Sequence, residues 1–136
     1  MLAQFLKIIF KKSHKMFKDY LIVGAGAFIG GALRFYISTI TKNILKGFPI
    51  GTLLINIIGC FLIGLFYGIM KSKNCPDSII LLLTTGFCGG FTTFSTLSWE
   101  GFNMIQNGNY YMFLLYVIGS ILLGIISVWI GISITK

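Results

Sequence analysis

The segment from Gly86 to Leu97, GFCGGFTTFSTL, is the part of this 136-residue chain best suited to ion chemistry. Three glycines and four Ser/Thr residues interrupt the third of four long apolar stretches, where they make poor helix. Lipid offers no hydrogen-bond partner to a broken backbone, so a break persists only where protein shields it or where it lines a polar path. We expect the helix to unwind over Gly89–Thr93, because glycines let backbone segments meet and adopt positive φ. Such an interrupted membrane helix is typical of an ion or substrate site: freed carbonyls favour a cation, and hydroxyls donate hydrogen bonds.

The apolar stretches account for most of the chain. Hydrophobic residues make up 56% of the sequence and charged residues only 10%, whereas soluble domains carry roughly 25% charged residues. Windows of the ~20 apolar residues that a bilayer requires cover Tyr20–Ile40, Ile50–Met70, Ile79–Asn103 and Tyr110–Ile134. We therefore expect an all-α membrane protein with four transmembrane helices and a break in the third. A chain this small encloses little interior, so we also expect it to oligomerise.

The net charge of +8 is concentrated in a basic tail, residues 1–18, which precedes the transmembrane domain, residues 19–136. Cations beside apolar spans indicate membrane orientation and anionic lipid rather than nucleic acid. With the N-terminus in the cytoplasm, eight cations lie inside and two, Lys42 and Lys46, outside; without the tail the balance is three against two. The core is thus typical of a protein able to insert in both directions. If the working unit is an antiparallel dimer, a copy whose orientation is fixed by the tail would need a related partner inserted in the opposite orientation.

The tail lacks the long apolar region and small-residue cleavage site of a signal peptide. We therefore expect it to be an amphipathic or disordered cytoplasmic segment. Its lysines either contact anionic headgroups or are simply solvated.

A few polar side chains stand out within the spans. Arg34 either snorkels to the interface or supplies a positive charge at a vestibule or dimer seam. Asn56 either forms a helix–helix hydrogen bond or directs its amide at a permeating anion. Glu100, near the end of the third span, pairs with a cation or caps a helix end. Tyr116 and Ser120 share a helix face, which aligns two hydroxyls toward a neighbouring helix or a polar track.

Catalytic and metal chemistry find little support in the side chains. Cys60, Cys75 and Cys88 lie in separate segments without metal-ligand spacing, and we expect Cys60 and Cys88 to be packing residues. His14 stands alone in the tail, so the chain lacks the nucleophile–base pair of an enzyme. The alternative function is a small dual-topology cation/drug–proton antiporter. Such an antiporter would need a carboxylate at the centre of the membrane, whereas Glu100 lies near the end of its span.

The chain resembles the Fluc/CrcB family of small fluoride channels along all four spans. The matching pieces are GAFIGGALRF, GTLLINIIGCFLIG and GFCGGFTTFST. The resemblance implies an antiparallel, dual-topology dimer in the plasma membrane, with two pathways that export fluoride passively. It also implies a structural Na⁺ on the dimer axis, held by the backbone carbonyls of Gly89 and Thr92 from each subunit.

The same resemblance implies a fluoride pathway. It is lined by an amide, an edge-on aromatic ring and several hydroxyls: Asn56, Phe94, Thr93, Ser95, Thr96, Tyr116 and Ser120. Arg34 matches the family's span-one arginine. Leu97 departs from the family, which has a second phenylalanine there, and leucine has no ring quadrupole to offer an anion. Either one half of a pore is altered in a homodimer, or the chain pairs with a homologous subunit.

Overall fold

The computed structural model describes residues 2–42, 44–45, 47–73 and 75–136 and is all-helical over its spans. The elements are α1 (Leu2–Thr41), α2 (Ile50–Lys73), α3 (Asp77–Ile80), the π-helix η1 (Leu81–Cys88), α4 (Gly89–Phe91), α5 (Phe94–Gln106) and α6 (Tyr110–Ser133). Four stretches of the described chain are long and apolar enough to cross a membrane: Lys15–Thr41, Ile50–Lys71, Asp77–Gln106 and Tyr110–Ser133. They coincide with the four predicted windows to within a few residues, and the third is bent, as predicted.

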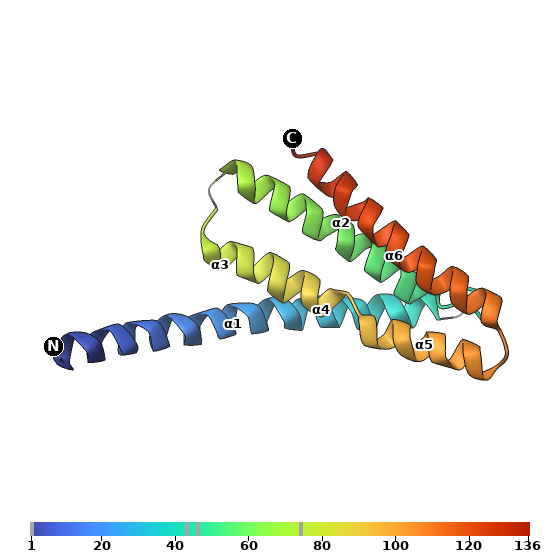
Figure 1. Ribbon diagram of the computed structural model, residues 1–136, viewed down its shortest axis with the longest axis horizontal. Coiled ribbons are helices and arrows are strands. Elements are labelled where there is room, and N and C mark those ends of the chain that lie inside the picture. Colours follow the sequence, from blue (N-terminus) through green and yellow to red (C-terminus); the bar gives the residue numbers. More distant parts are fainter. Residues whose placement is uncertain (1, 43, 46, 74) are drawn as a thin grey trace.

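The helices form two pairs (Figure 1). α2 packs along α6, and α1 packs along η1 and α4. The N-terminus, the connection from α2 to α3 and the C-terminus lie at one end of the bundle, and the other two connections lie at the opposite end. Which end faces the cytoplasm stays a prediction, and Lys46, counted at the outer end, lies outside the described residues.

Glycines allow the helices of each pair to approach closely. A Cβ on Gly26 of α1 would meet the carbonyl oxygen of Leu82 in η1. Between α2 and α6, a Cβ on Gly64 would meet the carbonyl oxygen of Val128. Close contact between backbones is the usual source of stability for helices in lipid, where the hydrophobic effect does not drive them together.

The glycines of the third span do not take the positive φ that the sequence suggests for them. Gly89 is right-handed helical, with φ −64° and ψ −38°. Among the described residues, the glycines with positive φ are Gly47 (89°) and Gly108 (73°), both in connections. Gly90 serves packing instead, since a Cβ there would lie 2.5 Å from the carbonyl oxygen of Ala27.

The basic tail has a helical backbone. α1 begins at Leu2 and runs without interruption through residues 2–18 into the first span, for 40 residues in total. Its N-terminal part projects beyond the rest of the bundle (Figure 1).

The close approach of α1 and η1 predicts different effects for two neighbouring glycines. Gly26→Ala should lower the free energy of unfolding by about 1–3 kcal/mol, because the added methyl overlaps backbone atoms that cannot move aside freely. Gly24→Ala is the matched control, since a Cβ there meets nothing within 4 Å. Thermal unfolding in detergent measures both, and equal midpoints for the two variants would contradict this packing.

Candidate functional site: the break in the third span

The third span is broken at two threonines. The helix ends at Phe91, and Thr92 (φ −76°, ψ 159°) and Thr93 (φ −149°, ψ 118°) are extended before α5 begins at Phe94. The sequence predicts unwinding over Gly89–Thr93, which is too wide, because Gly89 is still helical. Both extended residues are β-branched, a class whose side chains fit extended backbone better than helix.

Asn56 of α2 replaces the helix hydrogen bonds that Thr93 loses. In an uninterrupted helix the Thr93 N–H would donate to the Gly89 carbonyl. Here it donates to Asn56 Oδ1 at 2.8 Å, and Asn56 Nδ2 donates to the Thr93 carbonyl at 3.1 Å. The sequence leaves two roles open for Asn56, a hydrogen bond between helices and an amide directed at an anion. The structure shows a hydrogen bond from Asn56 to a neighbouring segment. Its amide nitrogen carries a second N–H for a further acceptor.

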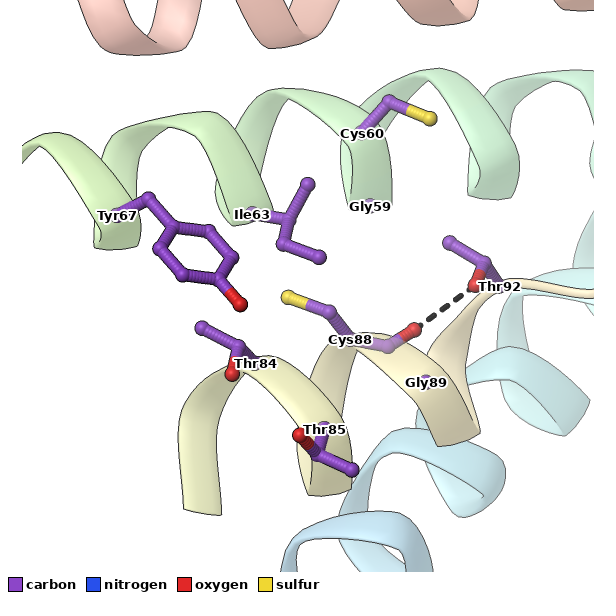
Figure 2. A pocket seen from close by; sticks show the side chains of 9 residues that line it. All are labelled: Gly59, Cys60, Ile63, Tyr67, Thr84, Thr85, Cys88, Gly89 and Thr92. Carbon is purple, nitrogen blue, oxygen red and sulfur yellow. Dashed lines mark hydrogen bonds between the residues drawn. The ribbon is translucent and has the colours of Figure 1, made fainter. Parts of the chain in front are cut away.

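Arg34 of α1 supports the break from the other side. Its Nη1 donates to the Thr92 carbonyl at 3.2 Å, and the residue is half-buried. Arg34 therefore contacts the break rather than only reaching the membrane interface. The Thr92 N–H and hydroxyl both donate to the Cys88 carbonyl, at 3.0 and 2.9 Å, and Figure 2 marks the hydroxyl bond.

The hydroxyls after the break cap α5. The Thr93 hydroxyl accepts from the Thr96 N–H at 3.2 Å and donates to the Thr96 hydroxyl at 3.0 Å. It also lies 3.3 Å from the Ser95 hydroxyl. Thr93 is thus the N-cap of α5, and the positive end of the α5 dipole faces the break, where it favours negative charge.

A cavity of about 250 Å³ beside the break brings most of the predicted pathway residues together. Its lining comes from α2, the break, α5 and α6: Asn56, Cys60, Thr92, Thr93, Phe94, Leu97, Val117, Ser120 and Ile121. Phe94 is 80% exposed, so its ring also faces out of the chain. Leu97 is buried with Met104 and Tyr116 in the apolar core of this chain. The residue that replaces the family's second phenylalanine therefore packs inward.

A second polar cluster lies farther along the bundle. Glu100 accepts hydrogen bonds from the Tyr116 hydroxyl at 2.7 Å and from the Thr52 hydroxyl at 3.0 Å. The Ser120 hydroxyl donates to the Tyr116 carbonyl at 2.6 Å. Among the described residues, Glu100 thus binds two hydroxyls, and its expected pairing with a cation or a helix end stays a prediction. Sequence reasoning missed Thr52, although it lies four residues before Asn56 and so shares its helix face.

Two further cavities meet at Glu100, at the end of the bundle where α1 connects to α2. Their volumes are about 520 and 310 Å³, and both are lined by Lys42, Phe48, Pro49 and Glu100. Tyr116 itself is only 1% exposed. Hydroxyl and carboxylate groups therefore continue from the break toward this end of the bundle.

Another cavity, of about 350 Å³, lies between α2 and η1 (Figure 2) and shares Cys60 and Thr92 with the cavity at the break. Gly89 lines this second cavity, and a Cβ there would meet nothing within 4 Å. Its carbonyl has lost the Thr93 N–H donor, so it is suited to binding a hard cation such as Na⁺. The Thr92 carbonyl already accepts from Arg34, which leaves it one lone pair. Each chain thus offers two oxygens, and the pair fits such an ion only if a second subunit supplies more.

Side chains offer little to a metal. The thiols of Cys60 and Cys88 are free and line the same cavity. No group of three or more His, Cys, Asp or Glu residues comes together in the described part of the chain.

The double hydrogen bond between Asn56 and Thr93 predicts a structural cost for its removal. Asn56→Ala should destabilise the protein by about 2–4 kcal/mol, because it leaves a backbone donor and a backbone acceptor unpaired. The resemblance to the fluoride-channel family implies loss of fluoride flux with assembly retained for Asn56→Asp. In this geometry the carboxylate would also repel the Thr93 carbonyl. Asn103→Ala is the control, and thermal unfolding is the measurement. We call this double hydrogen bond the Asn56–Thr93 clamp, and an Asn56→Ala variant as stable as the control would contradict it.

The chain is similar to known proteins over nearly all of its spans. A family model described as CrcB-like protein, Camphor Resistance (CrcB), matches residues 21–132. Relatives named Fluoride-specific ion channel FluC include those of Campylobacter lari (43% identical; 89% of this chain, 100% of the relative) and Phocaeicola vulgatus (42%; 85% and 96%). The relative from Chlorobium phaeobacteroides is 42% identical over 85% of this chain and 91% of its own length. With the family model and these relatives covering its spans, the chain belongs to the CrcB-like family of multi-pass membrane proteins.

Proposed function

We propose that this chain is the subunit of a fluoride-selective channel that lets fluoride leave the cytoplasm passively across the plasma membrane. The names of its relatives indicate an ion channel rather than an enzyme. The observation that carries the proposal is the cavity at the break, where an amide, hydroxyls and an aromatic ring come together.

Neutral donors suit the chemistry of fluoride. The ion is small and strongly hydrated, so a pathway must replace its water with hydrogen-bond donors. Asn56 has a second amide N–H to offer, the Thr93 and Ser120 hydroxyls lie at the same cavity, and the edge of the Phe94 ring carries partial positive charge. Such groups bind an anion without the full opposite charge that would trap it, which conduction requires.

The pathway is completed by a second, antiparallel subunit in this proposal. Phe94 directs most of its surface out of the chain, and Gly89 leaves open space beside its carbonyl. A two-fold partner would bring a second Gly89–Thr92 pair to the same place, and four carbonyl oxygens would then hold a structural Na⁺. The partner is a second copy or a homologous chain. Leu97 in place of the family's phenylalanine and the one-sided charge of the tail are the features that raise the second possibility.

Reconstitution tests the proposal directly. Liposomes containing the purified protein should release fluoride and retain chloride when ion-selective electrodes follow the efflux. Phe94→Ile should lose fluoride release, because isoleucine has no ring edge to offer the anion, with an unchanged elution volume. Phe102→Ile, on the same helix and 50% exposed, should keep its flux.

Other outcomes of the liposome experiment would change the proposal. Equal fluoride and chloride release would refute selectivity, and transport driven by a pH gradient alone would indicate an antiporter. Flux that appears only after a homologous subunit is added would identify the heterodimer.

The open space at Gly89 predicts a defect of assembly rather than of folding. The Cβ of Gly89→Leu would meet nothing within 4 Å, so far-UV circular dichroism should stay unchanged while the protein elutes as a monomer. The wild-type dimer should unfold at a higher temperature in NaCl than in an equal concentration of N-methylglucamine chloride, and Gly89→Leu should lose that difference. A variant that stays dimeric, or a wild type indifferent to Na⁺, would remove support for the shared site.

A further inference from the structure

The first thirteen helical residues of α1 extend past the bundle. Lys15 Nζ lies 3.9 Å from Asp77 Oδ2, and Asp77 is the first residue of α3, so this ion pair marks the level at which the third span begins. At 1.5 Å per residue, residues 2–14 span about 20 Å. Figure 1 shows this part of α1 projecting beyond the rest of the bundle. The family model matches from residue 21 onward, so the extension lies outside the part of the chain that the channel family shares.

The extension has two chemically different faces in helical register. Residues that recur every three or four positions along one face are basic: Lys7, Lys11, Lys15 and Lys18. The residues of the opposite face are apolar: Leu2, Phe5, Leu6, Ile9 and Met16. Lys12 falls outside the basic face. Residues 2–18 hold five lysines and no acidic residue, so the segment favours a negatively charged partner with an apolar layer beneath it.

We propose that residues 2–14 form an interfacial helix that lies on the anionic surface of the membrane. A helix with lysines on one face and Leu, Ile and Phe on the other places its apolar face in the headgroup–acyl boundary. Each lysine of the basic face is attracted to anionic lipid, which strengthens binding about fivefold for that lysine. The site therefore recognises a bilayer containing anionic headgroups, and it anchors α1 on one side of the membrane.

Docking requires α1 to bend where it leaves the bundle, between Ser13 and Lys15. Water and headgroups at this level can satisfy the backbone groups that a bend releases. Lys15 and Lys18 lie on the described, exposed part of the helix, next to the surface that the rest of the segment would contact. The channel need not conduct fluoride for this contact to form.

Fluorescence of the full-length protein in nanodiscs tests the proposal. An environment-sensitive dye is attached at Ile9→Cys or at Lys11→Cys, after replacement of the three native cysteines (Cys60, Cys75 and Cys88) by alanine. In discs containing phosphatidylglycerol, a lipid-borne quencher should quench the dye at position 9 several-fold more than the dye at position 11. Equal quenching would overturn the proposal. Quenching at position 9 that is unchanged in discs of phosphatidylcholine alone would also overturn it, because the contact would then not depend on anionic headgroups.

Two variants that each remove one positive charge test whether docking depends on the basic face or only on the net charge of the segment. Lys11→Gln should weaken the docking equilibrium of the dye at position 9 about fivefold, whereas Lys12→Gln, which removes the same charge from outside that face, should change it less than twofold. Equal effects would refute the assignment of faces. Trypsin cleavage in the tail of the wild-type protein, which needs no labelling, should be slower in phosphatidylglycerol discs than in phosphatidylcholine discs, and equal rates would likewise refute docking.

Discussion

An amide side chain on one helix allows the backbone of another to open within the apolar part of the bundle. Lipid offers no partner to the N–H and carbonyl groups that a helix break exposes, and each unpaired group costs several kcal/mol. Asn56 supplies both a donor and an acceptor to Thr93, and Arg34 supplies a donor to the Thr92 carbonyl. Two extended residues are therefore stable at a depth where most sequences form helix.

The polar groups of the site are arranged by this break. Because the chain re-enters helix at Phe94, Thr93 caps the new helix and directs the positive end of its dipole at the cavity. The same turn leaves the Phe94 ring exposed beside the cavity. The one carboxylate of the cluster, on Glu100, lies farther along and is held by Tyr116 and Thr52. The break itself thus keeps neutral donors and one guanidinium, an environment suited to an anion.

Sequence reasoning located the four spans and the interrupted one, because hydropathy and the cluster of glycines and threonines are local signals. It placed the unwinding partly on Gly89, which is helical, because the use of a glycine depends on what packs against it. The contact of Gly90 with Ala27 is tertiary and leaves no local trace. The pairing of Glu100 with Thr52 joins residues 48 positions apart, which only the folded chain brings together.

Amide hydrogen exchange at Thr93 tests the clamp most directly. NMR of the protein in micelles can compare Thr93 with Thr92, whose N–H is bonded to the Cys88 carbonyl. The clamp predicts that both amides are protected in the wild type and that Asn56→Ala accelerates exchange at Thr93 while Thr92 stays slow. Equal protection of Thr93 in both proteins would show that its N–H bonds within a continuous helix, and would contradict the account.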